Sequence, residues 1–438
     1  MACHHGGTAG PCTPIPSVTS ITPTSAAALG PAFPLTVNGT DFVSNSIVRW
    51  KGIDRTTTFF SSIQLQAAIP ASDLRSQGTA DVTVFNPIGS GCSSATVTFT
   101  INPASTAKFA YVTNPLTSVV AAFTINASTG KLTANGVDAT GTSPLGLAAD
   151  PAGTFLYVAN FDSNSVSMFT IDSAGGGLTA NGTVGAGVQP VAVTVHPSGK
   201  FAYVANEGSN NISQYSIDTT TGQLTSGQLS SLGTVAAGAN PTDITVDPTG
   251  QFAYATNFGS GTVSMYSVNT TTGVLSSLGE VAAGGDAESI AVQPSGEFAY
   301  TGNLLAGTVS VFSVNTNTGA LTLNGGVGAG FGADSVAVHP TGEFAYVVLQ
   351  GAGLVAVYTV DANTGALTFV NSVAPDSPGS GPHQIVLDPS GQFAYVTNLS
   401  TGNVSLFTIN DSTGDLTFVQ VVDVGLSADS MALAGRTP

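Results

Sequence analysis

The stretch "DPSGQFAYVTN" at residues 388–398 decides the fold, because the chain repeats it. Close copies are "HPSGKFAYVAN" (196–206), "DPTGQFAYATN" (247–257), "QPSGEFAYTGN" (293–303) and "HPTGEFAYVVL" (339–349), and weaker copies are "DPAGTFLYVAN" (150–160) and "AKFAYVTN" (107–114). Proline fixes φ and glycine supplies a positive φ, as a tight turn requires. The aromatic and β-branched residues that follow are typical of a strand. The chain therefore repeats one strand seven times, and in six of these copies the same turn precedes it.

The spacing of these copies predicts a β-propeller. Their tyrosines are separated by 46, 46, 51, 46, 46 and 49 residues. Within residues 241–279, "TDITVD", "QFAYATN", "GTVSMYSV" and "VLSSLGEV" each have the pattern of a strand. A period of 40–50 residues made only of strands indicates one four-stranded blade per repeat. No helical periodicity is present, so we expect almost no helix.

The C-terminal strand is predicted to close the ring. The second strand of the repeat occurs seven times, but only six first strands precede them. The missing first strand is "ADSMALAG" at 428–435, which matches "ADSVAVHP" at 333–340. Pairing of this tail with the strand at 109–114 would complete the first blade and remove an exposed edge. One blade cannot bury its own faces, whereas seven in a circle can.

The N-terminal region has a different pattern. Residues 1–15 are rich in Gly, Pro and Thr and are predicted to be a flexible tether. Residues 16–103 contain short alternating runs such as "FPLTVNGTDF" and "ADVTVFNP", which predict the half-buried strands of a β-sandwich with Trp50 in its core. The propeller is assigned to residues 108–438. The predicted fold class is therefore all-β, a sandwich followed by a seven-bladed propeller.

Composition restricts the partners. The formal net charge is −17 with eight basic residues, so the chain lacks the basic face that binds nucleic acid or an anionic membrane. No apolar run reaches the roughly 20 residues of a membrane helix. Only 8% of residues are charged, and the abundant Ser, Thr, Asn and Gly are typical of exported surface proteins. We expect an extracellular or cell-surface protein of bacterial type.

Three cysteines, Cys3, Cys12 and Cys92, occur in the chain. They form no CxxC pair, so a zinc ribbon or a thioredoxin-type site is not supported. Cys12 and Cys92 flank the predicted sandwich and would form a disulfide in an oxidising compartment; the alternative is two free thiols. The opening "MAC" resembles the end of a bacterial lipoprotein cleavage site, which implies lipidation of Cys3.

The repeat resembles the YVTN family of seven-bladed propellers and the wider lactonase family, which includes propeller-type 6-phosphogluconolactonases. This resemblance covers residues 108–438. The stretches "PSVTSITPTSA", "LTVNGTDFVSNSIVRWKG" and "GTADVTVFNP" resemble the IPT/TIG family of immunoglobulin-like domains. That second resemblance implies a spacer or an interaction module without catalysis.

Candidate chemistry lies where the first strand of each repeat begins, because this strand lines the channel of a propeller. Aligned on the turn proline, one position reads Leu145, Val191, Thr242, Glu288, Asp334, His383 and Asp429. The last four come from adjacent blades and would form a polar sector beside an apolar one. They predict a pocket for a small polyhydroxylated ligand or a divalent cation. The alternative is that they cap strand ends and meet channel water. No other cofactor is expected.

The lactonase resemblance reaches some of these residues. "GPHQIVLDP" (381–389) matches a family segment and gives His383, and "YVANE" (203–207) matches another and gives Glu207. A third segment departs from the family pattern, with Val191 where the resemblance implies Arg. A phosphorylated substrate requires cationic groups, so the acidic sector argues against one. His196 and His339 are interpreted as caps of the repeated turn.

Two functions follow. The first is a non-enzymatic protein that acts in protein–protein interaction, adhesion or extracellular assembly, with a protein partner or like subunits. Low charge and hydroxyl-rich surfaces favour it. The alternative is a lactonase-like hydrolase that uses His383 with Glu288, Asp334 and Asp429.

Overall fold

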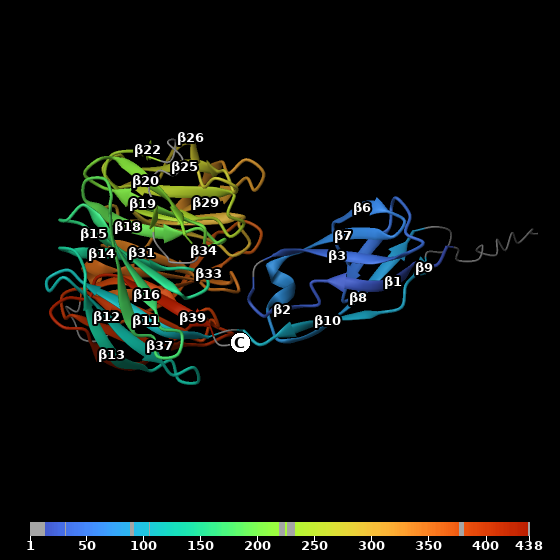
Figure 1. Ribbon diagram of the computed structural model, residues 1–438, viewed down its shortest axis with the longest axis horizontal. Coiled ribbons are helices and arrows are strands. Elements are labelled where there is room, and N and C mark those ends of the chain that lie inside the picture. The colour runs from blue at the N-terminus through green and yellow to red at the C-terminus, as the bar shows by residue number, and fades with distance from the viewer. Residues whose placement is uncertain are drawn as a thin grey trace, which may run out of the picture. The chain divides into compact units, whose positions relative to one another are not determined.

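The computed structural model describes residues 14–30, 32–87, 92–104, 106–218, 224–225, 233–375 and 381–436. The chain divides into two compact units, unit 1 (residues 1–105) and unit 2 (residues 106–438), which Figure 1 shows as separate sets of strands. The predicted tether lies outside the described residues except for its last two. Helix is limited in the described residues to two 3-10 turns, η1 (Ala71–Leu74) and η2 (Gln350–Ala352). No described helix is long and apolar enough to span a membrane.

Unit 1 is a β-sandwich. One sheet has the strand order β1 (Ser17–Thr22), β3 (Phe33–Thr40), β7 (Gln64–Ile69) and β6 (Thr57–Ser61). The other sheet has the order β2 (Ser25–Ala27), β10 (Val97–Asn102), β8 (Gly78–Asn86), β4 (Ile47–Trp50) and β5 (Ile53–Asp54), with β9 (Cys92–Ser93) paired to β8. Their inner faces share one buried cluster.

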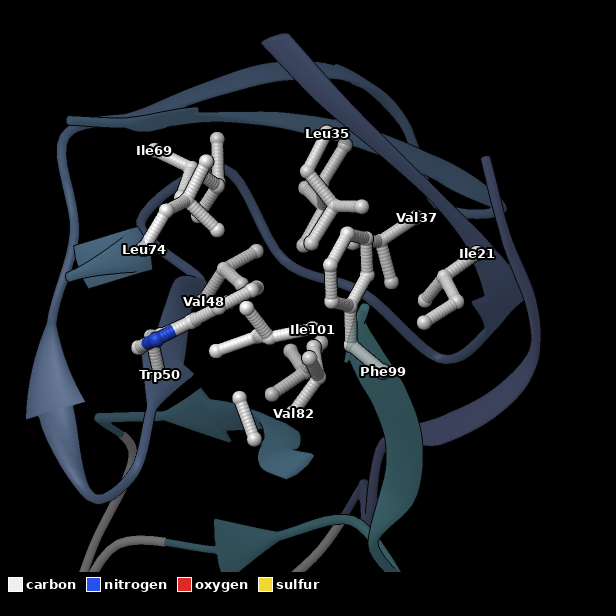
Figure 2. Close-up of a cluster of buried hydrophobic side chains, with 14 of the residues drawn as sticks. Ile21, Leu35, Val37, Val48, Trp50, Ile69, Leu74, Val82, Phe99 and Ile101 are labelled. Atoms are coloured by element: carbon white, nitrogen blue, oxygen red, sulfur yellow. The ribbon is translucent and has the colours of Figure 1, made fainter. Parts of the chain in front are cut away.

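The core of unit 1 confirms the prediction for Trp50, which is 1% exposed. Its ring lies 4.9 Å from that of Phe99, and Leu35 comes from the opposite sheet (Figure 2). Cys92 is buried and disulfide-bonded. Cys3 and Cys12, the other two cysteines, lie outside the described residues, so their predicted lipidation and pairing stay predictions. The resemblance to IPT/TIG domains also stays a prediction.

Unit 2 forms seven antiparallel sheets within the described residues, which confirms the propeller. Blade 1 consists of β13 (Leu132–Ala139), β12 (Val119–Ile125), β11 (Ala107–Asn114) and β39 (Met431–Arg436). Blade 2 is β14 (Pro144–Ala149), β15 (Phe155–Asn160), β16 (Ser165–Ile171) and β17 (Leu178–Gly185). Blade 3 is β18 (Pro190–Val195), β19 (Phe201–Asn206) and β20 (Asn211–Ile217), which pairs with both β21 (Leu224–Thr225) and β22 (Thr234–Ala236).

Blades 4 to 7 have the same strand order as blade 2, from the central channel outward. Blade 4 is β23 (Pro241–Val246), β24 (Phe252–Asn257), β25 (Thr262–Val268) and β26 (Leu275–Ala282). Blade 5 is β27 (Ala287–Val292), β28 (Phe298–Asn303), β29 (Thr308–Val314) and β30 (Leu321–Gly328). Blade 6 is β31 (Ala333–Val338), β32 (Phe344–Leu349), β33 (Leu354–Val360) and β34 (Leu367–Val373). Blade 7 is β35 (Pro382–Leu387), β36 (Phe393–Asn398), β37 (Asn403–Ile409) and β38 (Leu416–Asp423).

The last strand closes the ring as predicted. β39 pairs antiparallel with β11, with Tyr111 opposite Ala432, and the two strands lie side by side in Figure 1. Just before β39, the Thr113 amide donates to the Ser430 carbonyl at 3.0 Å. The two ends of unit 2 thus belong to one sheet, and its first blade keeps no open inner edge.

The repeated tyrosines are buried, as predicted, and their hydroxyls also join neighbouring blades. Tyr300 Oη donates to the Gly365 carbonyl in the next blade's outer turn at 3.0 Å. The last of these bonds runs from Tyr395 of blade 7 to Gly130 of blade 1, at 2.8 Å. Gly130 has φ 68°, and a Cβ there would stand 2.5 Å from the Phe393 ring. The turn glycine therefore permits both the backbone conformation and the close contact between blades.

The structure confirms that His196 and His339 cap turns. His196 Nδ1 lies 2.8 Å from Ser198 Oγ in its own turn, and its Nε2 lies 2.9 Å from the Gly250 carbonyl in the next blade. His339 makes the equivalent contact with Gly391 at 2.9 Å. Burial lowers the pKa of His339. Both imidazoles therefore hold one blade to the next.

Candidate functional site

The first strands of the blades surround a cavity. β14, β18, β23, β27, β31, β35 and β39 contact one another in this order, and β39 contacts β14. The cavity at the start of these strands has a volume of about 530 Å³. Its lining includes the whole column that the repeat alignment picked out: Leu145, Val191, Thr242, Glu288, Asp334, His383 and Asp429. The closed ring therefore brings together side chains that are up to 284 residues apart in the sequence.

His383 stands between two aspartates from the neighbouring strands. Its Nδ1 donates a hydrogen bond to Asp334 Oδ2 at 2.7 Å. Its Nε2 lies 3.6 Å from Asp429 Oδ2, which is an ion-pair distance and too long for a hydrogen bond. The imidazole side chain is 26% exposed, whereas that of Asp334 is 4% exposed. Asp334 thus orients the ring through Nδ1, and Nε2 remains available to a molecule in the cavity.

The carboxylates around His383 favour its charged form. Burial alone would lower the pKa of this imidazole, but Asp334, Asp429 and Glu288 together raise it to about 10. His383 is therefore an imidazolium at neutral pH, with both nitrogens protonated. The consequence is chemical: in this state His383 is a hydrogen-bond donor and a positive charge, and it is not a base.

Glu288 is the second group whose protonation is unusual. Burial, followed by the negative charge of Asp334, raises its pKa to about 8, although His383 opposes this shift. Asp243 and Glu207 contribute smaller repulsions. At neutral pH Glu288 therefore carries a proton that it can donate, which is how a carboxyl group serves as an acid.

Two further acids join the predicted four. Glu207, which follows β19, lines the cavity, and burial raises its pKa. Asp243 on β23 also lines it, and burial raises its pKa despite two backbone hydrogen bonds. Asp243 directly follows Thr242 of the column, and the lactonase resemblance pointed to Glu207. Burial also raises the pKa of Asp429, although the charge of His383 lowers it.

The polar residues that directly follow the column positions in the sequence have a structural role. Asp243 accepts the Ile290 amide from the next strand at 3.0 Å. Gln384 Oε1 accepts the Met431 amide in the same way at 2.6 Å. Ser289 and Ser335 repeat this contact between the intervening strands. These side chains join adjacent first strands, so they fix the positions of Glu288, Asp334, His383 and Asp429 relative to one another.

The opposite sector of the cavity is mostly apolar, with Glu207 of blade 3 as its acidic member. Leu145 and Val191 begin the strands of blades 2 and 3, and Leu147 and Val193 lie deeper on the same strands. Phe258 and Leu304, in the loops after β24 and β28, also line the cavity. The column predicted Leu145 and Val191, but the two loop residues were missed because these loops differ in sequence between repeats.

Other candidate sites carry less chemistry. Unit 1 has a cavity of about 600 Å³ lined by Asp54 and Arg55, but the Arg55 guanidinium is held at 2.5 Å by Asp73. Within the described part of the chain, no group of three or more His, Cys, Asp or Glu side chains has an arrangement that could hold a metal ion. The predicted divalent cation therefore stays a prediction. The channel-mouth cavity is the candidate site.

Comparison with known proteins gives one family. A sequence model of the family described as lactonase, 7-bladed beta-propeller matches residues 44–195, 185–330 and 290–428. Comparison with curated protein sequences gave no match.

Solved structures share the propeller. A putative 6-phosphogluconolactonase from Bacteroides fragilis is similar with a TM-score of 0.66 and 21% identity, over 76% of this chain and 98% of the other. The periplasmic gluconolactonase of Pseudomonas aeruginosa gives a TM-score of 0.63 and 19% identity, over 76% and 99%. A protein from Lactobacillus plantarum gives 0.66 and 23%, over 75% and 100%. At these identities the similarity establishes the fold alone.

Proposed function

Because the chain belongs to the lactonase family of seven-bladed β-propellers, we propose that unit 2 is a lactone hydrolase whose active site is the channel-mouth cavity. The family membership favours this function over the non-enzymatic interaction protein that the composition suggested. The observation that carries the proposal is the state of His383, whose Nδ1 is held by Asp334 while its Nε2 remains available to the cavity.

The chemistry begins with attack of water on the lactone carbonyl carbon. As the new C–O bond forms, negative charge develops on the carbonyl oxygen, and the Nε2–H of the His383 imidazolium can stabilise it. The Asp429 carboxylate lies 3.6 Å from the same nitrogen and can take the proton that the water loses. Asp334 acts as a positioning residue, because its largely buried carboxylate accepts the hydrogen bond from Nδ1 and so fixes the ring.

The second step opens the ring. When the tetrahedral intermediate collapses, the bond from the carbonyl carbon to the ring oxygen breaks, and this oxygen leaves with the electron pair. Glu288 carries a proton at neutral pH and can transfer it to the leaving oxygen. The product is a hydroxy acid, and the proton taken by Asp429 returns through solvent to Glu288. Water, one carboxylate, one carboxylic acid and one imidazolium are sufficient for the reaction.

A pH-stat assay of acid release tests the proposal, with δ-gluconolactone and γ-butyrolactone as substrates and the spontaneous rate subtracted. The wild type should open at least one of them. We expect His383→Ala to lower kcat/KM by about 100-fold or more, as for loss of an oxyanion donor. Glu288→Gln should lower it by about 100-fold, as for loss of a general acid.

The matched control is Glu280→Gln, the same chemical change at an exposed residue of the outer strand β26. It should retain the wild-type rate, and all variants should keep the wild-type melting temperature within a few degrees. No hydrolysis above the buffer rate would refute the proposal and favour a binding protein. Full activity in both His383→Ala and Glu288→Gln would place the reaction elsewhere.

A further inference from the structure

The channel-mouth cavity is divided into two unlike halves. Glu288, Asp334, His383 and Asp429 occupy four consecutive positions of the ring, and Leu145 and Val191 occupy the two that follow Asp429. A ligand that fills the cavity must therefore present a polar group to one side and an apolar surface to the other. A sugar lactone, which carries hydroxyls all around its ring, would leave polar groups unpaired against the apolar half.

The apolar half is extended and accessible. Leu145, Val191, Phe258 and Leu304 are each partly exposed to the cavity, and they come from four different blades. Leu305, directly after Leu304, is 61% exposed at the rim. Val188, three residues before Val191, is 51% exposed, and its carbonyl accepts the amide of Gly208 beside the cavity. Exposed apolar side chains therefore also occur close in sequence to the apolar residues of the cavity wall.

The charge of the cavity excludes anions. Of the described residues that line it, five carry a carboxyl group and none is Lys or Arg. The positive charge of His383 lies between the carboxylates of Asp334 and Asp429, which offset it. The carboxylates also have partners: Asp243 accepts two amides, and Asp334 accepts from His383. The site therefore repels an anionic ligand. Because these carboxylates already have hydrogen-bond partners, a cationic ligand is not required to neutralise them.

We propose that the substrate of this cavity is an uncharged lactone that bears an apolar substituent on its ring. This inference rests on the proposed function, because it assigns a substrate class to the same site. The lactone carbonyl lies at His383, and the substituent lies along Leu145 and Val191 towards Phe258 and Leu304. A cavity of about 530 Å³ is within the range of roughly 300–1,000 Å³ that accommodates ligands larger than a bare ring.

Four γ-lactones that share one ring test the substrate class: γ-butyrolactone, γ-octalactone, γ-carboxy-γ-butyrolactone and α-amino-γ-butyrolactone. Their ring substituents are, in the same order, hydrogen, an apolar butyl chain, an anionic carboxylate and a cationic amine. Burial of each methylene is worth roughly a factor of four, so kcat/KM for γ-octalactone should exceed that for γ-butyrolactone by at least about tenfold. The carboxylate should be the poorest substrate. A carboxylated or amino lactone that is opened fastest would overturn the inference.

Variants at Val191 test the position of the substituent. Val191→Arg places a cation at the start of β18, where the family resemblance implies one, and Val191→Gln is the neutral polar control. Val191→Arg should raise the ratio of carboxy- to butyl-lactone activity by at least about tenfold. Val191→Gln should lower the preference for the butyl chain without raising activity on the anion. Equal ratios in the wild type and both variants would show that the substituent does not lie here.

Calorimetric binding of the same four lactones to His383→Ala separates this inference from the proposed function. If the wild type opens lactones without preferring the butyl chain, the substrate class is wrong and the hydrolase stands. If nothing is hydrolysed, the hydrolase proposal fails, and tighter binding of γ-octalactone than of γ-butyrolactone still supports the amphipathic cavity. Equal or undetectable binding of the two overturns it.

Discussion

Removal of the negative charge beside His383 should change its protonation near neutral pH. The replacement Asp334→Asn keeps the shape of the side chain, and its amide oxygen can still accept the hydrogen bond from Nδ1. What it removes is the carboxylate charge whose oxygen lies 2.7 Å from the ring. We expect the pKa of His383, about 10 in the wild type, to fall strongly.

The size of this fall follows from the geometry. With a contact of 2.7 Å between the atoms, the two charges are centred about 4 Å apart, and their attraction is about 4 kcal/mol at an effective dielectric constant of about 20. Since one pKa unit corresponds to about 1.4 kcal/mol, the shift is about 3 units. The imidazole of Asp334→Asn should therefore titrate near pH 7, because Asp429 and Glu288 still oppose the effect of burial.

Nuclear magnetic resonance of the imidazole signals between about pH 5 and pH 11 measures this directly. The chain has five histidines, and the spectrum of His383→Ala identifies the signal that is lost. Glu280→Gln on β26 is the control and should leave the titration unchanged. In Asp334→Asn, lactone hydrolysis should also decline above about pH 7, where the imidazolium is lost. A shift of less than one unit, or a wild-type pKa near 6.5, would refute the electrostatic reasoning.

Three further changes test the site and the scaffold. The carboxyl of Glu288 binds its proton more tightly in the folded protein, with a pKa of about 8 against 4.5 when unperturbed. The free energy of unfolding should therefore fall as the pH rises from about 5 to about 8, and Glu288→Gln should make this slope clearly smaller in urea titrations. Tyr395→Phe leaves the buried Gly130 carbonyl unpaired between blades 7 and 1 and should lower the free energy of unfolding by about 1–3 kcal/mol. Tyr300→Phe should have the same effect between blades 5 and 6. A negligible loss of stability in either variant would mean that water replaces the hydroxyl. In Gly130→Ala the new residue must adopt a positive φ, and its Cβ stands 2.5 Å from a buried Phe ring, so the free energy of unfolding should fall by about 2 kcal/mol or more. A Cβ at Gly177 meets no atom within 4 Å, so Gly177→Ala should leave the melting temperature nearly unchanged.

The sequence predicted the scaffold well because the scaffold is repeated. Seven copies of one strand define the period, and one displaced copy of the first strand, at residues 428–435, was enough to predict that β39 pairs with β11. The bonds from Tyr395 to Gly130 and from Tyr300 to Gly365 were not predicted. Each joins one blade's tyrosine to the next blade's outer turn, and that meeting depends on the rotation between blades, which no local pattern contains.

The site was predicted in part for the same reason. The register of the repeat identified Glu288, Asp334, His383 and Asp429 as neighbours, and the closed ring places them on one cavity. It could not predict that His383 would bond Asp334 at 2.7 Å and stand 3.6 Å from Asp429, because side-chain distances across blades depend on fractions of an ångström in strand placement. Loop residues such as Phe258 escape a repeat analysis altogether.

The differences between repeats therefore locate the function better than the similarities do. Positions that join the blades are nearly constant, as the tyrosines and turn glycines show, because every blade meets the same packing requirement. At the channel mouth the same register holds Leu145 in one blade and Glu288 in another, so packing does not dictate the residue there. Burial raises the pKa of Glu288, which means that its charged form is destabilised and that an apolar side chain would serve the fold better. A buried acid that the scaffold does not need is therefore a candidate for a role in chemistry.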